Sequence, residues 1–270
     1  MPVATIEQRK ANLARLLATI SAHCPSEPAR EIDAQNRARI TPLTHAVKLD
    51  KLPGILTSEA LLSQLQIGAK IREAERILET TDDVFLYVGA FGYPATECGF
   101  LFLSSIEDSH QQTGISTPFD SGALATTRYV KQPDHYPDGP ACVRDHELPV
   151  SDYRKLLGTV IHTHSRSADE FLENPADFSC FCGVPRPHPF GLSGGDNRAA
   201  TFEVRIPSRV PLKPPYLRAV FVPEGIVPPE LSALSASGVE IVRYTPIDDG
   251  NYFFTLRNAC IQFILEHIVP

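Results

Sequence analysis

Residues 40–56, ITPLTHAVKLDKLPGIL, and residues 197–207, NRAATFEVRIP, indicate the class of fold most directly. The first stretch holds an apolar run that ends at His45 and then leucines at helical spacing, which predicts a strand followed by a helix over residues 52–65. The second stretch is rich in aromatic and β-branched residues, which is typical of a strand, and it contains one glutamate, Glu203. An early strand and helix together with a late strand that carries a carboxylate predict an α+β fold.

Alternation along the late strand gives Glu203 a defined side. Successive side chains point to opposite faces of a strand, so Glu203 and Arg205 share one face while Val204 lies on the other. We therefore expect Glu203 to point away from the core, toward a cleft. The plain alternative is a solvated glutamate that pairs with Arg205 on an exposed face.

Further strands and a closing helix follow from apolar runs. DVFLYVG at residues 83–89 and CGFLFLS at residues 98–104 predict two strands, which we expect to be adjacent at the centre of the sheet. Strand-like runs recur at residues 217–222 and 239–244, and an amphipathic pattern over residues 253–268 predicts the last helix.

The length and composition of the chain favour a single large core. A chain of 270 residues with 43% hydrophobic side chains can bury a sizeable interior. We expect an N-terminal helix within residues 1–30 and one domain over residues 31–270. That domain should contain a loop-rich insertion at about residues 111–195, in which only residues 156–161, LLGTVI, read as a strand.

Charge and hydropathy exclude several classes of protein. A net charge of −7 gives the chain no global electrostatic footprint for nucleic acid. No apolar stretch approaches the roughly 18 to 20 residues that span a bilayer, and the N-terminus lacks the pattern of a secretory signal. Six cysteines are too few for a disulfide framework in a chain of this size. We expect a cytoplasmic protein with reduced thiols and no membrane partner.

The two stretches quoted first resemble the two ends of the NAD-binding site in the DarT-like branch of the ADP-ribosyltransferase superfamily. In that branch a histidine followed by a leucine-rich helix opens the domain, and a strand of the type Ala-Glu-Val closes it. The resemblance covers residues 40–65 and 195–245. It implies an ADP-ribosyltransferase-like split β-sheet core with flanking helices, and NAD-dependent mono-ADP-ribosyl transfer to a nucleic acid or protein. It also implies a toxin or defence effector, which an antitoxin would neutralise.

Glu203 is the candidate catalytic carboxylate. Cleavage of the bond between nicotinamide and ribose passes through an oxocarbenium-like state, which a carboxylate beside the ribose stabilises. The resemblance also implies a catalytic arginine, for which Arg198 is the candidate, while Arg128 is a candidate cation for the NAD pyrophosphate. The sequence STPFDSGAL at residues 116–124 predicts a turn at Asp120 that either lines the site or is an ordinary turn.

The candidate NAD-binding residues come from the first two predicted strands. His45, with Thr44 beside it, would hold the adenosine ribose of NAD, which is positioning rather than chemistry. Tyr87 and Tyr93 are candidates to stack on nicotinamide. The plain alternatives are a histidine that hydrogen-bonds structurally and tyrosines that belong to the core.

The acceptor is less constrained than the NAD site. Duplex DNA would require clustered cations, so the acidic balance favours single-stranded nucleic acid or protein. Arg205, Arg209 and Lys213 are candidate contacts for a single strand, or they are the charges of a solvated edge strand.

A second constellation, in the expected insertion, indicates a metal. A strand that ends in His-x-His resembles the zinc motif of JAMM-type metallopeptidases, although Pro175 stands where that pattern has an aspartate. Imidazole and thiolate are zinc ligands, and the site would be structural with four protein ligands or catalytic with three. The candidate ligands are His162, His164, Cys180, Cys182 and His188. A loop without metal explains the same residues.

Three hypotheses from different classes therefore stand. The chain is an NAD-dependent ADP-ribosyltransferase, a zinc-dependent hydrolase that uses His162 and His164, or a non-catalytic binding module on an NAD-binding fold.

Overall fold

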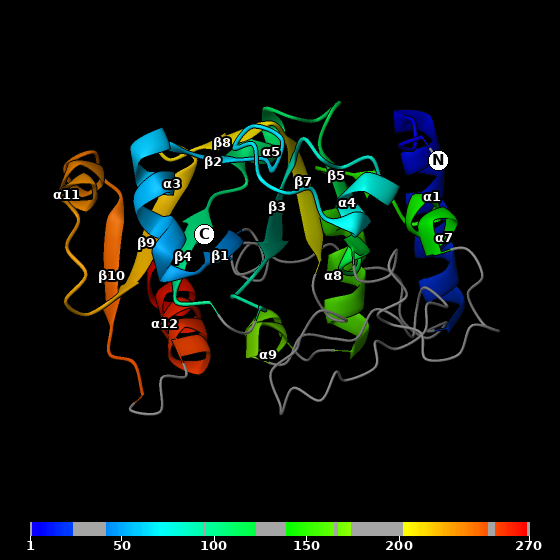
Figure 1. Cartoon of the computed structure of the whole chain (residues 1–270). Coiled ribbons are helices and arrows are strands. Elements are labelled where there is room, and N and C mark those ends of the chain that lie inside the picture. Colours follow the sequence, from blue (N-terminus) through cyan, green and yellow to red (C-terminus); the bar gives the residue numbers. More distant parts are fainter. Residues whose placement is uncertain are drawn as a thin grey trace.

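A mixed β-sheet of eight strands forms the centre of the molecule (Figure 1). The structure is a computed structural model that describes residues 2–23, 42–93, 96–122, 139–164, 167–173, 202–247 and 252–268. From one edge to the other, the strands are β10 (Glu240–Tyr244), β9 (Leu217–Pro223), β4 (Cys98–Phe102), β1 (Leu43–Val47), β3 (Asp83–Val88), β7 (Glu203–Pro207), β5 (Ile115–Thr117) and β6 (Leu148–Pro149). β10 and β9 run parallel, and the other neighbouring strands run antiparallel. A separate pair joins β2 (Ala60–Leu62) to β8 (Arg209–Pro211).

Helices surround this sheet. In chain order they are α1 (Ile6–His23), the 3₁₀ turn η1 (Leu49–Lys51), α3 (Leu52–Ser58), α4 (Glu73–Ile77), α5 (Ser105–Asp108), α7 (Gly139–Asp145), α8 (Tyr153–His164), α9 (Ala168–Glu173), α11 (Pro229–Ala236) and α12 (Tyr252–His267). Among the helices of the described residues, none has the length and apolar character needed to cross a bilayer. The α+β architecture, the strands at residues 83–89, 98–104, 217–222 and 239–244, and the closing helix are confirmed.

The sheet is split between β1 and β3. β1 pairs with β4 along its whole length, but it pairs with β3 through two residue pairs, the second of which joins Thr44 to Tyr87. Beyond this pair the His45 ring, rather than the backbone of β1, reaches the carbonyl oxygen of Phe85. The expectation that β3 and β4 are adjacent is wrong, because β1 lies between them.

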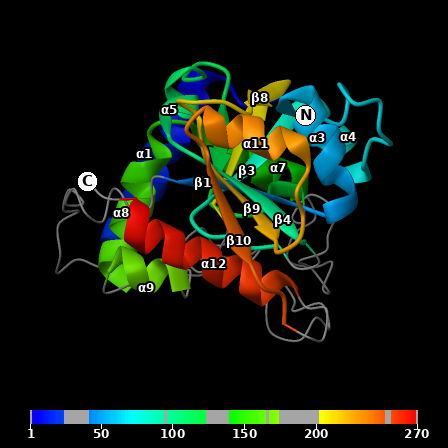
Figure 2. The same cartoon turned by 90° about the vertical axis from the view of Figure 1, so that its left-hand side faces the viewer.

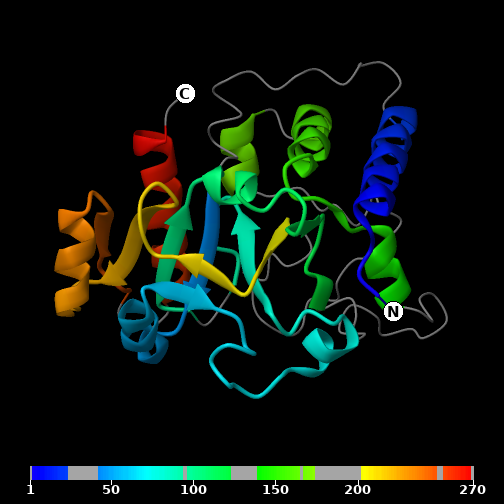
Figure 3. The same cartoon turned by 90° about the horizontal axis from the view of Figure 1, so that it is seen from above.

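Hydrophobic clusters cover both faces of the sheet. Successive side chains of β4 point to opposite faces. Phe100 belongs to the cluster that includes residues of α3 and α8, whereas Leu101 belongs to the cluster that includes residues of α12. α12 supplies Leu256 and Ile264 to the second cluster and packs on β9 and β10 (Figure 2). α9 contacts α12 and α8 contacts α1, so that these four helices stand in a row (Figure 3).

Two local expectations are corrected. Residues 156–161 were expected to form a strand, but they belong to α8. Tyr153, Leu156 and Leu157 recur at positions i, i+3 and i+4 and are fully buried, so a helical face satisfies this sequence better than a strand does. The helix expected over residues 52–65 ends at Ser58, where Glu59 takes a left-handed conformation with φ 52°, and β2 follows.

Candidate active site

Four side chains form a row across neighbouring strands on one face of the sheet. The register places Thr44 of β1 opposite Tyr87 of β3, and Tyr87 opposite Glu203 of β7. Glu203 in turn lies opposite Thr117 of β5. Directly opposed residues of antiparallel strands project to the same face. Three of the residues that we expected in the site therefore lie next to one another in one row.

Glu203 is enclosed rather than open. The residue is 1% exposed, because the segment that follows β5 covers its face of the sheet. Ser121 Oγ donates a hydrogen bond to Glu203 Oε1 at 2.5 Å, and Thr117 Oγ1 lies 3.5 Å from the same oxygen. Glu203 does share a face with Arg205, as alternation predicts, but it is neither directed into solvent nor paired on an exposed face.

The surroundings of Glu203 favour its protonated form. Burial raises the pKa of Glu203 to about 8, and the charge of Asp120 adds to the rise, while Arg205 and Ser121 oppose it. A carboxyl group with this pKa changes its charge near neutral pH. A positively charged ligand beside it would favour the ionised form.

Two tyrosines lie next to this carboxyl group. The rings of Tyr87 and Tyr93 are 4.7 Å apart between centroids, and both residues are half-buried. Tyr93 Oη donates a hydrogen bond to Asp120 Oδ2. Burial raises the pKa of both phenols well above the ordinary value, so both remain neutral donors. A pair of electron-rich rings beside carboxylates suits a flat cationic ligand.

His45 is fixed as one tautomer. Its Nδ1 lies 2.7 Å from the carbonyl oxygen of Phe85, and because a carbonyl only accepts, Nδ1 carries the proton and donates it. Burial lowers the pKa of His45, which keeps the ring neutral. Its Nε2 therefore holds a lone pair that can accept a hydrogen bond from a hydroxyl group. The hydroxyl of Thr44 uses its proton within the protein, since Oγ1 donates to the Tyr87 carbonyl oxygen at 3.1 Å.

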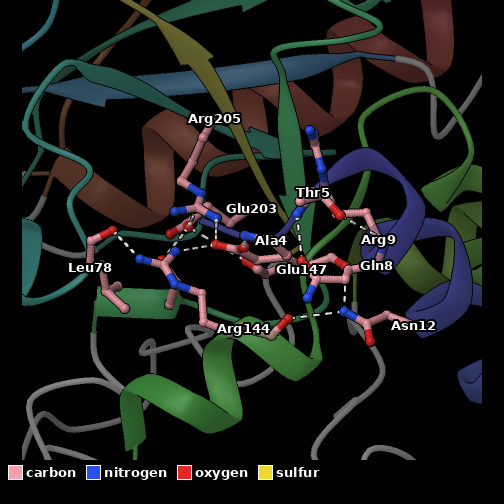
Figure 4. A network of polar contacts seen from close by, with 12 residues as sticks. Ala4, Thr5, Gln8, Arg9, Asn12, Leu78, Arg144, Glu147, Glu203 and Arg205 are labelled. Carbon is pink, nitrogen blue, oxygen red and sulfur yellow. Dashed lines mark hydrogen bonds and ion pairs between the residues drawn. The ribbon is translucent and has the colours of Figure 1, made fainter. Parts of the chain in front are cut away.

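A buried network of charges adjoins Glu203 (Figure 4). Glu147 Oε1 accepts hydrogen bonds from Arg144 Nη1 and Arg205 Nη2, both at 2.5 Å. Its second oxygen accepts from the backbone amide of Ala4 at 2.8 Å. Arg205 Nε lies 3.8 Å from Glu203 Oε1. The network therefore connects the segment before α1 to the candidate catalytic carboxylate.

The structure resembles those of DarT ADP-ribosyltransferases. DarT of Thermus sp. 2.9 in complex with NAD+ matches with a TM-score of 0.40 and 13% identity, over 76% of this chain and 95% of that chain. The same protein in complex with ADP-ribosylated ssDNA matches with a TM-score of 0.42 and 14% identity, over 76% and 94% of the two chains. DarTG of Thermosipho africanus in complex with ADP-ribose matches with a TM-score of 0.41 and 12% identity, over 80% of this chain and 51% of that chain. No protein-family model and no curated protein matches the sequence.

Several of the expected site residues lie elsewhere. Arg205 was a candidate contact for single-stranded nucleic acid, but it is 1% exposed and cannot touch an acceptor from outside. His162 and His164 lie in the helix α8, so the expectation of a strand that ends in His-x-His is wrong. Other candidates lie outside the described residues: Arg128, Cys180, Cys182, His188 and Arg198.

The structure also brings in residues that the sequence did not single out. Arg72, just before α4, lies close enough to His45 and Tyr87 for its charge to act on the pKa of each. No local pattern distinguishes it from other cations of that polar stretch. Glu147 had no sequence signal either, because its partner Arg205 is 58 positions away along the chain.

Proposed function

We propose that this protein is an NAD-dependent mono-ADP-ribosyltransferase. One observation carries the proposal, namely the carboxyl group of Glu203 next to the ring pair of Tyr87 and Tyr93, with Asp120 close to both. The nicotinamide of NAD is a flat ring with a positive charge, and it is joined to a ribose on which positive charge develops as the bond breaks. Tyrosine rings bind the cationic nicotinamide ring, and a carboxylate stabilises the positive charge on the ribose.

The residues divide the reaction between them. The bond between the ribose carbon and nicotinamide breaks, and its electron pair leaves with neutral nicotinamide. Ionised Glu203 stabilises the oxocarbenium-like ribose until the acceptor heteroatom forms the new bond. The acceptor proton then passes to a carboxylate, for which Asp120 is the candidate because it faces the same site and binds Tyr93.

His45 holds NAD in register in this proposal. Its Nδ1 is committed to Phe85, so Nε2 accepts a hydrogen bond from the adenosine ribose. Arg72 is the described cation that best fits the pyrophosphate or the acceptor, because its charge acts at both His45 and Tyr87.

We further propose that the acceptor is single-stranded nucleic acid, or otherwise protein, rather than duplex DNA. The net charge of −7 disfavours a duplex, whereas Arg209 and Lys213 remain exposed after Arg205 is excluded. The activity is of the toxin or defence-effector type, and an antitoxin is the expected partner. Growth arrest of host cells on expression, relieved by Glu203→Gln, tests this role.

The decisive experiment measures nicotinamide release from NAD by the purified full chain, with a cell extract as the source of acceptors. We expect release by the wild-type protein and loss of at least about 100-fold in Glu203→Gln, since removing a preorganised charge of this kind typically costs that much. Glu224→Gln is the matched control, because Glu224 is exposed and lies in the turn after β9.

Other results would point to other functions. Wild-type turnover by Glu203→Gln would remove the carboxylate from the mechanism and overturn the proposal. An NAD-induced rise in melting temperature without consumption of NAD would identify a non-catalytic binding module. Loss of activity on chelation, with Glu203→Gln still active, would move the chemistry to the histidines of α8.

A further inference from the structure

Arg205 is buried without a complete set of partners. Its side chain is 0% exposed, and Nη2 donates to Glu147 Oε1 at 2.5 Å. Within the described residues, its Nε and Nη1 have no hydrogen-bond partner. An arginine buried for structural support alone would have its donors saturated. The spare donors lie beside Glu203, with Nε 3.8 Å from Oε1, so the guanidinium is available to that carboxylate when it is charged.

Glu147 prevents Arg205 from moving away. Glu147 is 0% exposed and is held from three elements, by Arg144 of α7, Arg205 of β7 and the amide of Ala4 before α1. Charge-assisted hydrogen bonds of this kind are strong and directional. The carboxylate of Glu147 therefore holds Nη2 of the guanidinium, while Nε of the same group lies 3.8 Å from Glu203 Oε1 (Figure 4).

Building on the proposed function, we propose that Arg205 is a positioning residue of the active site, which Glu147 anchors so that its positive charge favours the ionised form of Glu203 that catalysis requires. Glu203 needs such a cation because it must be negatively charged to stabilise the ribose, although its burial opposes that charge. Arg205 touches Glu203 rather than NAD, so it acts on the reaction through the carboxylate.

The charged groups around the pair define the expected directions. Glu203 faces Asp120 after β5, Tyr87 of β3, Tyr93 of the following loop and Arg205 of β7. The groups that face Arg205, besides Glu203, are Asp83 of β3, Glu147 before β6, Arg144 of α7 and Arg9 of α1. Loss of the positive charge at position 205 should raise the pKa of Glu203, and loss of the Glu147 carboxylate should raise it too, because Arg205 is then no longer held beside Glu203.

The test titrates Glu203 directly, without NAD. The protein is labelled with ¹³C at glutamate side-chain carboxyls, and the Glu203 resonance is assigned by its absence from Glu203→Gln. In Arg205→Met we expect the midpoint of the Glu203 titration to rise by about one pH unit or more, and in Glu147→Gln to rise by a smaller amount. Arg205→Lys should keep a midpoint near that of the wild-type protein. Arg154→Met is the matched control, because it breaks a buried ion pair with Glu107 at another place in the fold and should leave the midpoint unchanged.

The pH profile of nicotinamide release provides a second measurement. Its acidic limb should move with the Glu203 midpoint, so Arg205→Met should lose about tenfold in rate at neutral pH for each pH unit by which that midpoint rises.

An unchanged midpoint in folded Arg205→Met overturns the proposal, as does an equally large change of the midpoint in Arg154→Met. If Arg205→Met does not fold, Glu147→Gln decides: a rise of the Glu203 midpoint supports the proposal, and a fall or no change overturns it. Failure of both variants to fold would assign Arg205 a structural role and refute the proposal. Absence of NAD cleavage by the wild-type protein would refute the proposed function but would leave the titration result standing.

Discussion

At Glu203, the ionised form that the proposed function requires is the form that destabilises the fold. Its carboxyl group is enclosed by Ser121 and Thr117, close to the charge of Asp120, and burial raises its pKa to about 8. The ordinary value for glutamate in an unfolded chain is about 4.3. Ionised Glu203 therefore costs the folded state free energy, and the cost appears when the pH rises.

This opposition predicts how stability depends on pH. Between about pH 4.3 and 8 the folded protein holds a proton on Glu203 that the unfolded chain has released, so the free energy of unfolding falls as pH rises. The stability that the folded protein gains from its raised Glu203 pKa is fully present below about pH 4.3 and is lost as the pH rises through about 8. Glu203→Gln should remove up to about 1.4 kcal/mol of this decline per pH unit and should be more stable than the wild-type protein at pH 8. Urea unfolding at several pH values, with Glu224→Gln as control, measures the difference. Parallel curves for the wild-type and Glu203→Gln proteins would show that Glu203 ionises normally.

His45→Ala should separate binding from chemistry. The variant loses the acceptor at Nε2 and the bond from Nδ1 to Phe85, so we expect KM for NAD to rise about 5- to 10-fold, as for a lost hydrogen bond, with kcat nearly unchanged. Steady-state kinetics of nicotinamide release provide the measurement. A fall in kcat with unchanged KM would instead place His45 at the reacting atoms.

The positions of the candidate site residues could be predicted to different degrees. The local sequence pattern placed Glu203, His45 and Tyr87 in strands, which the structure confirms. Arg72 and Glu147 were missed, because they lie outside the strands and helices, in segments whose positions depend on tertiary packing. Strand alternation gave the correct face for Glu203 but not its burial, which comes from a segment 82 positions earlier in the chain.

At the scale of elements, the loop after β3 is held on two sides. Phe91 packs edge-on against Phe221 of β9, with ring centroids 5.4 Å apart. Arg257 of α12 donates to the carbonyl oxygen of Phe91 at 2.8 Å and to that of Leu172 in α9 at 2.6 Å. These contacts fix the loop that carries Tyr93 into the site.

Gly99 tests this arrangement. A methyl group added at Gly99 would overlap the Phe91 ring, which is fully buried and cannot swing into solvent. Gly99→Ala should therefore lower the free energy of unfolding by about 1 to 3 kcal/mol, as overpacking does, and should also raise KM for NAD as Tyr93 shifts. Gly54→Ala is the control, since Gly54 lies in α3 with open space around it, and alanine there should be neutral or stabilising by up to about 1 kcal/mol. Equal stability of the two variants would show that Phe91 adapts freely.

Elements with strong local patterns were predictable, and those set by tertiary contacts were not. The runs at residues 83–89 and 98–104 are strands because aromatic and β-branched residues pack on both faces of the sheet. Residues 156–161 are also rich in apolar and β-branched residues but form a helix, because Tyr153, just before them, completes a buried helical face. β2 consists of three residues and exists through its pairing with β8, which no local pattern reveals.

At the scale of the whole molecule, α1 ties the far edge of the sheet to the site. Arg9 donates to the carbonyl oxygens of Gly114 and Gln112 just before β5, and Asn12 donates to those of Arg144 and Glu147. The strand β5 carries Thr117, and the segment before β6 carries Glu147. The N-terminal helix thus supports both of the segments that enclose Glu203 and Arg205.

Ala4→Pro removes a further contact at this edge, the hydrogen bond from the Ala4 amide to Glu147. Proline has no amide hydrogen, so Glu147 would lose the donor at Oε2 while buried, which should cost about 1 to 3 kcal/mol of stability. Ala4→Ser keeps the amide and serves as the control. The midpoints of urea unfolding compare the two. If both variants unfold at the same urea concentration, the amide contributes nothing to the network.

The order of the strands was beyond prediction from sequence. Consecutive strands pair in most sheets, which favoured β3 next to β4. Here β1 enters between them, because Thr44 and its neighbours pair with β4 on one side and with β3 on the other.

The split between β1 and β3 gives the molecule an unusual mechanical character. The ladder holds β1 to β4 over five residue pairs and β3 to β7 over five, but β1 to β3 over two. Under load, the sheet should part along this line, so that β10, β9, β4 and β1 separate from β3, β7, β5 and β6. Two residue pairs also join β5 to the edge strand β6, so the sheet has a weak line through its middle as well as one at its rim.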